Sequence, residues 1–147
     1  AAPWHAHYPR GTRSAIDPLT KRNLAALVEA PRREYGPQTA FTCCLPNGMN
    51  GSLTFEALGA ASDAFAGWLR ECAGVQAGDR VAVQMPNCLA YPVAAFGILK
   101  AGAVLVNTNP LYTPEEMTKQ FRDAGIKVLV IVDMFADKLP AVTAAVA

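Results

Sequence analysis

The sequence predicts an α/β fold: a partial doubly wound parallel sheet flanked by helices, with an N-terminal β-hairpin. Three short apolar runs (VAV, AVLV and VLVIV) follow one another between residues 80 and 132. Continuous apolar runs, rather than alternating ones, are typical of strands that are buried on both faces of a parallel sheet. The segments between these runs have room for helices, so we expect right-handed crossovers.

Residues 1–20 are expected to form an extended arm, because three prolines and a glycine interrupt any helical pattern there. Residues 21–147 are expected to form one α/β subdomain. From about Asn23 to Tyr35, apolar residues recur at helical spacing. Pro31 lies inside that pattern and is expected to kink or end the helix.

A hairpin and a long helix are predicted next. Ala40–Leu45 is β-prone, and a run of turn residues separates it from a return strand over Ser52–Thr54. Thr54 is expected to cap a helix that runs to about Cys72. The apolar stripe predicted on this helix consists of Leu58, Ala61, Phe65, Trp68 and Leu69.

Three strand–helix units follow the hairpin. The strands are predicted over Arg80–Met85, Ala103–Val106 and Lys127–Val132. The helices are predicted over Leu89–Lys100, over Pro114–Asp123 and from about Phe135. The second of these helices has a well-defined start, because Thr113 and Glu116 have capping-box spacing around Pro114.

The composition argues against several classes of protein. The formal net charge is +1 and the sequence has no basic block, which argues against nucleic-acid binding. The four cysteines form no C-x-x-C pair, so we interpret them as buried free thiols in a reducing cytosol. His5 and His7 have no cysteine or carboxylate nearby and are interpreted as surface residues. The sequence shows neither a signal-peptide pattern nor an apolar run long enough to span a bilayer.

The sequence also lacks the short motifs of several enzyme classes. It contains no G-x-G-x-x-G, no G-x-x-x-x-G-K-[ST] and no G-x-S-x-G. A typical dinucleotide dehydrogenase, a Walker-type NTPase and a serine hydrolase are therefore disfavoured. Asp79 and Arg80 lie where the chain enters the first strand of the parallel sheet, at the wrong end of the sheet for a ligand site, and are expected to be structural.

Ligands of doubly wound domains bind outside the carboxyl ends of the strands. Here those ends lead into residues 86–87, 107–112 and 133–134. Two interpretations of the second loop remain open: Asn109 and the backbone line a substrate channel, or the loop is only the turn that launches the next helix. Asp133 likewise either binds a ribose or caps a helix.

The chain resembles the N-terminal part of the acyl-adenylate-forming enzymes, and among them the bacterial long-chain fatty acid–CoA ligases. The resemblance runs from about Trp4 to the C-terminus. Segments shared widely are SLTFEAL at 52–58, GDRVA at 78–82 and MPN at 85–87. Segments more particular to the long-chain branch are YP at 8–9, IDP at 16–18, YPVA at 91–94, FGILKAG at 96–102 and NTNPLYTPEE at 107–116.

This resemblance implies an enzyme that activates a fatty acid with Mg-ATP to acyl-AMP and pyrophosphate, and then forms the acyl-CoA thioester. It implies ATP, Mg²⁺ and CoA as cofactors, a cytoplasmic location, and peripheral contact with the inner membrane. In the family, the phosphate-binding loop, the Mg/ATP acid, the ribose-binding Asp and the catalytic Lys lie beyond the segment that this chain resembles. We therefore assign no catalytic residue and no metal ligand here, and expect these 147 residues alone to be inactive.

One loop carries over from the family. In CoA ligases, the loop that matches Asn109, Pro110 and Leu111 lies near the pantetheine tunnel, although related sequences often have Gly where this chain has Pro-Leu. The chain ends inside a helical pattern, which suggests an N-terminal fragment with an apolar sheet edge that favours a homodimer. The alternatives are a fragment of a medium-chain or aryl acid ligase, or a free-standing flavodoxin-like interaction module.

Overall fold

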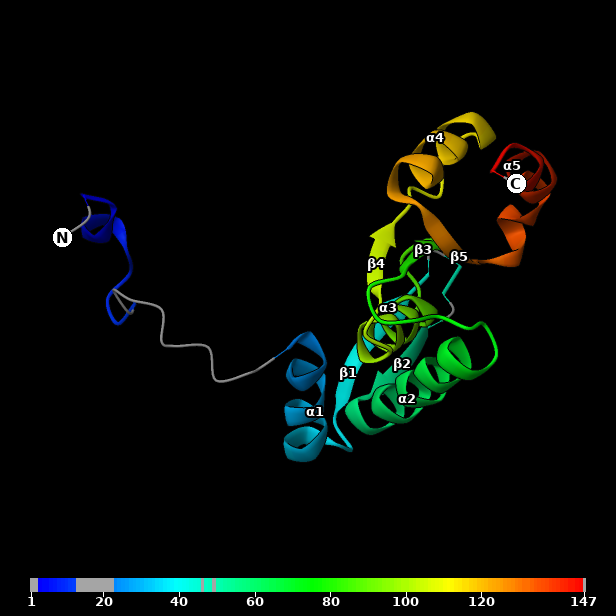
Figure 1. Ribbon diagram of the computed structural model, residues 1–147. Helices are drawn as coiled ribbons and strands as arrows, with labels where there is room; N and C mark the ends of the chain where they lie inside the picture. The colour runs from blue at the N-terminus through cyan, green and yellow to red at the C-terminus, as the bar shows by residue number, and fades with distance from the viewer. Residues whose placement is uncertain (1–2, 13–22, 46, 49, 147) are drawn as a thin grey trace.

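The computed structural model describes residues 3–12, 23–45, 47–48 and 50–146. The described chain has a three-stranded parallel sheet, a two-stranded antiparallel hairpin and helices on both faces of the parallel sheet (Figure 1). The strands are β1 (Thr39–Cys44), β2 (Asn50–Thr54), β3 (Arg80–Gln84), β4 (Val104–Asn107) and β5 (Ile126–Ile131). The helices are α1 (Leu24–Tyr35), α2 (Phe55–Glu71), α3 (Ala90–Lys100), α4 (Pro114–Ala124) and α5 (Leu139–Val146), with 3-10 helices η1 (Pro3–His7) and η2 (Asp133–Lys138).

The parallel sheet has the order β4-β3-β5, so the chain steps to one side of β3 and then crosses to the other. Val81 of β3 pairs with Leu105 of β4 and with Val128 of β5. This arrangement confirms the predicted doubly wound parallel sheet and the predicted hairpin.

Alternate side chains of β3 supply two hydrophobic cores. Val81 and Val83 pack with Leu69 of α2 and Ile98 of α3 on one face. Ala82 packs on the other face with a second group, Met117, Phe121 and Val142 from α4 and α5. Figure 1 shows α2 and α3 on one side of β3 and β5, with α4 and α5 on the other.

Burial on both faces holds for β3 but not for its neighbours. Residues 81–84 of β3 are all buried, whereas β4 and β5 contain no fully buried residue. Val104 of β4 is 47% exposed. The predicted burial on both faces is therefore correct for β3 and wrong for β4 and β5. Among the described residues, β4 and β5 each pair only with β3 and form the edges of the sheet.

The N-terminal part departs from the predictions at two places. Residues 3–7 form a 3-10 helix, so the expected extended arm is not extended throughout, and residues 13–20 lie outside the described part. Helix α1 continues past Pro31 to Tyr35, where the sequence favoured a kink or an end. Packing of α1 against α2, and ion pairs from Arg32 to α2, provide tertiary support for the turn that follows the proline.

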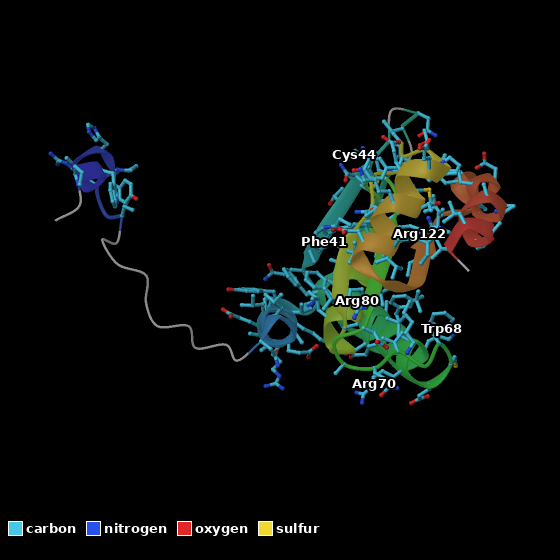
Figure 2. The ribbon with its side chains drawn as sticks, turned by 45° about the horizontal axis from the view of Figure 1, so that its top comes forward. Phe41, Cys44, Trp68, Arg70, Arg80 and Arg122 are labelled. Atoms are coloured by element: carbon cyan, nitrogen blue, oxygen red, sulfur yellow. The ribbon has the colours of Figure 1, made fainter. Side chains whose placement is uncertain are left out.

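Two further differences concern helices. Trp68 is 49% exposed and lies at the outer side of α2 (Figure 2), stacked on Phe65 with ring centroids 5.9 Å apart. Trp68 therefore does not belong to the buried apolar stripe that was predicted for α2. The helix expected near Phe135 begins as the 3-10 helix η2, and the α-helix starts only at Leu139.

No helix within the described residues has the length and apolar character needed to cross a membrane.

Candidate functional site at the carboxyl end of the sheet

The β4–α4 connection, residues 108–113, lies at the carboxyl edge of the parallel sheet. Thr108 N donates to Val83 O at 2.9 Å, which continues the β3–β4 pairing for one residue past β4. The strand order reverses at β3, and the carboxyl edge at such a reversal is where doubly wound folds bind ligands. The loop therefore lies where a ligand site is expected in this type of fold.

Asn109, Pro110 and Leu111 form a compact turn. Asn109 Oδ1 accepts a hydrogen bond from Leu111 N at 3.0 Å, the geometry of an Asx-turn. The carbonyl of Asn109 accepts a hydrogen bond from Tyr112 N, also at 3.0 Å. The residues therefore form the turn that precedes α4, and Asn109 uses its side chain inside the loop. Leu111, in contrast, is 82% exposed and presents an apolar side chain to solvent.

Two residues that the sequence analysis did not single out hold this turn in place. Gln84, at the end of β3, is fully buried, and its Nε2 donates to Asn109 O at 3.0 Å. Lys138, at the end of η2, donates from Nζ to Pro110 O at 2.9 Å and to Tyr112 O at 2.8 Å. A polar residue that ends an apolar strand was a visible signal for Gln84, but no sequence pattern marked Lys138.

Asn107, the last residue of β4, is fixed from two helices. Tyr91 of α3 donates its hydroxyl to Asn107 Oδ1 at 2.9 Å. Gln120 of α4 donates Nε2 to Asn107 O at 3.0 Å. The loop therefore begins from an anchored residue.

Unused hydrogen-bonding capacity remains at this end of the sheet. Gln84 Oε1, Thr108 Oγ1 and Gln120 Oε1 are buried and have no hydrogen-bond partner among the described residues. Buried polar atoms in native proteins are nearly always paired, with protein, water or ligand. These oxygens lie below the surface, so the donor that suits them is an internal water.

The start of α4 is as predicted. Thr113 Oγ1 accepts from Glu116 N at 3.3 Å, and Glu116 Oε2 accepts from Thr113 N at 2.8 Å. The backbone and hydroxyl hydrogen bonds from Thr113 lower the pKa of the Glu116 carboxyl. The capping box thus fixes the loop where it enters the helix.

The other residues considered from the sequence do not join this site. Asp79, just before β3, pairs with Lys127 Nζ at 2.7 Å, and this hydrogen bond is the main reason that its pKa is lowered. Arg80 donates Nε to Ala124 O at 2.9 Å and lies along the sheet in Figure 2. Both side chains therefore make contacts that join β3 to the start of β5 and the end of α4. Asp133 is exposed and accepts a local hydrogen bond from Met134 N, at 2.8 Å.

The cysteines and acids form no metal centre in the part of the chain that the structure describes. No group of three or more His, Cys, Asp or Glu side chains there is arranged to hold a metal ion. All four cysteines are free, but the predicted burial is wrong: Cys44 and Cys72 are exposed, and Cys43 and Cys88 are half-buried. Cys43 and Cys88 line a pocket of about 380 Å³ between β1 and the start of α3.

A comparison with known protein families decides the relationship. The family described as "AMP-binding enzyme" matches residues 28–147. The chain belongs to this family. The resemblance inferred from the sequence motifs is confirmed.

Curated relatives of this AMP-binding family chain are named as long-chain-fatty-acid–CoA ligases. The protein from Salmonella typhimurium is 43% identical over 136 residues, which are 92% of this chain and 23% of the relative. The protein from Bacillus subtilis is 34% identical over the same length. The chain thus spans about a quarter of the length of these relatives.

Solved structures show the same fold. An anthranilate CoA ligase in complex with anthranoyl-AMP superposes with a TM-score of 0.78 over 88% of this chain and 24% of that chain, at 22% identity. The N-terminal domain of FACL13 from Mycobacterium tuberculosis superposes with a TM-score of 0.74 over 84% of this chain and 30% of that one, at 24% identity.

Proposed function

We propose that this chain is part of a long-chain fatty acid–CoA ligase. The observation that carries the proposal is 43% identity over 92% of the chain to enzymes of that name. Such an enzyme joins a fatty acid to the α-phosphate of ATP with release of pyrophosphate, and CoA then displaces AMP to give the thioester. Fatty acid, ATP with Mg²⁺, and CoA are the proposed substrates and cofactors.

These 147 residues are proposed to support the reaction rather than to catalyse it. An anionic acid must attack a polyanion, so catalysis depends on groups that neutralise and position phosphates. The sequence has no glycine-rich phosphate loop, and the described residues have no acidic cluster for Mg²⁺. ATP and Mg²⁺ do not fit the side chains described here, and we expect the isolated chain to lack adenylation activity.

The loop Asn109–Leu111 is proposed to border the path of the CoA pantetheine arm. This arm is neutral and carries both amide groups and apolar stretches. An exposed Leu111 side chain on a fixed turn suits the apolar stretches. The residues present therefore fit this part of CoA.

Location and assembly follow from the proposed substrate and from the exposed apolar residues. We propose a cytoplasmic protein that contacts the inner membrane peripherally, because long-chain acids partition into bilayers. We also propose self-association of the isolated chain through apolar residues near its open sheet edges. Exposed apolar residues on the strands include Phe41 of β1 and Val104 of β4. A single monomeric species in sedimentation runs at increasing concentration would contradict self-association.

An aryl acid ligase is the second candidate. The supporting observation is 42% identity over 66 residues, 45% of this chain, to 4-coumarate–CoA ligase 2 of Oryza sativa. The long-chain assignment is preferred because its relatives match twice that length at similar identity. A free-standing interaction module remains the outcome if no ligase activity accompanies the chain.

The test is to express the whole reading frame that encodes this chain and to assay CoA thioester formation. The acids compared are palmitate, octanoate, benzoate and 4-coumarate. We expect the highest kcat/KM with palmitate. Preference for benzoate or 4-coumarate would replace the long-chain proposal with the aryl one. An expressed protein that forms no CoA thioester would overturn the ligase proposal. A reading frame that stops at Ala147 would overturn it as well.

A further inference from the structure

We propose that Lys138 is a positioning residue for the thioester-forming step, because its ammonium group clamps the loop that borders the CoA path. This inference rests on the proposed function and assigns a role to a residue outside the loop. Lys138 lies 28 residues from Pro110 and 26 from Tyr112 in sequence, yet it bonds to both. The contact therefore joins the segment after β5 to the segment after β4.

The clamp fixes which way the loop faces. The carbonyls of Pro110 and Tyr112 both point to Lys138 Nζ, at 2.9 and 2.8 Å. The Leu111 side chain, between them in sequence, is 82% exposed. With the flanking carbonyls turned inward, the apolar side chain is the group that the loop presents to a ligand.

A lysine suits this position better than a neutral side chain. An ammonium has three donors and no acceptor, so one group can bond to two carbonyls at once. Hydrogen bonds from a charged donor are roughly twice as strong as neutral ones. The ammonium also lies 5.0 Å from the centroid of the Phe135 ring, which adds a cation–π contact within η2.

Gln84 holds the same loop from the sheet. Its Nε2 donates to Asn109 O, so three of the four carbonyls from Asn109 to Tyr112 accept a hydrogen bond from Gln84 or Lys138. Gln84 is fully buried in the core strand, whereas Lys138 belongs to a short 3-10 helix that follows an edge strand. Lys138 is thus the anchor that can be removed without disturbing the core.

Hydrogen exchange on the 147-residue chain tests the clamp itself. Lys138→Met keeps the length of the side chain and removes the donors. We expect the Leu111 and Tyr112 amides to exchange about tenfold faster, the factor that corresponds to one charge-assisted hydrogen bond. Lys119→Met, an exposed change on α4 with the same loss of charge, is the control and should leave these amides unchanged. Equal exchange in wild type and Lys138→Met would overturn the clamp.

Kinetics of the protein made from the whole reading frame test the role. In Lys138→Met we expect the KM for CoA to rise about tenfold while ATP–pyrophosphate exchange, which reports the first step, stays within about twofold. Lys138→Arg, which retains charged donors, should recover part of the CoA affinity. An unchanged KM for CoA, or an equal loss in pyrophosphate exchange, would overturn the role of Lys138 while leaving the proposed function intact. A wild-type protein without ligase activity would overturn both.

Discussion

Lys100 Nζ lies 2.6 Å from Asp63 Oδ1, which ties the last turn of α3 to the middle of α2. The same ammonium lies 2.8 Å from Glu29 Oε1 of α1. Arg32 of α1 approaches Asp63 from the other side, with Nη1 at 2.7 Å from Oδ2. The Lys100 side chain is only 8% exposed, so a nearly buried cation connects three helices through carboxylates at their surface.

Replacing Lys100 with Met should lower the free energy of unfolding by about 1–2 kcal/mol. The estimate lies between the values for exposed and buried pairs, because the Asp63 side chain is 52% exposed while Lys100 is not. Met retains the apolar stem, so the loss reports the charge and its hydrogen bonds. Urea unfolding of the 147-residue chain measures the change. Lys119→Met serves as the control, and equal midpoints for the two variants would contradict a stabilising role for Lys100.

Two glycines in neighbouring helices should respond to alanine in opposite directions. An added Cβ at Gly97 of α3 would lie 2.7 Å from Phe65 Cδ1 and 3.1 Å from the backbone oxygen of Ser62. An added Cβ at Gly67 of α2 would meet no atom within 4 Å. We therefore expect Gly97→Ala to destabilise the chain by about 1–3 kcal/mol through overpacking, and Gly67→Ala to stabilise it by up to about 1 kcal/mol through helix propensity.

Thermal unfolding of both glycine variants beside the wild type checks this pair. The wild-type melting temperature should lie between those of the two variants. A Gly97→Ala chain as stable as Gly67→Ala would mean that α2 and α3 are farther apart than the structure has them.

The start of α4 offers a test of local capping. Thr113→Ala removes the side chain that accepts from Glu116 N, and should cost about 1 kcal/mol of stability. Glu116→Gln should cost less, because glutamine also completes a capping box. Chemical unfolding of the two variants gives the comparison. A larger loss for Glu116→Gln than for Thr113→Ala would show that charge, and not the cap, stabilises this turn.

The sequence predicted the elements of this fold well because their signals are local. Apolar runs located all three parallel strands, and the spacing of Thr113 and Glu116 located the start of α4 within the chain. The Asn109 turn was also a correct prediction, since its hydrogen bonds join residues two or three apart.

The remaining features depend on contacts between distant parts of the chain. Gln84 and Lys138 reach the loop across 25 to 28 residues, and no periodicity encodes such a contact. The exposure of Val104 depends on whether another strand pairs with β4. An apolar run does not predict which strands pair. Trp68 fits the helical stripe by spacing alone, but its position on α2 faces away from the cores.

The stability of the chain should depend on pH in the acidic range. Ion pairs and hydrogen bonds lower the pKa of four carboxyl groups below their ordinary values: Glu56, Asp63, Asp79 and Glu116. For Asp63, the hydrogen bond from Lys100 is the largest cause. A carboxyl whose pKa is lower in the folded chain binds its proton more readily in the unfolded one. The stabilisation is therefore complete above the unfolded pKa and is lost as the pH falls through the folded value.

We thus expect the free energy of unfolding to be level near neutral pH and to decline from about pH 4.5 downward, where unfolded Asp and Glu begin to bind protons. Urea unfolding of the wild type at several pH values measures this profile. Asp63→Asn should give a shallower decline, because one of the four carboxyl groups with a lowered pKa is then absent. Stability that stays constant from pH 6 to about pH 3 would mean that these ion pairs do not persist in solution.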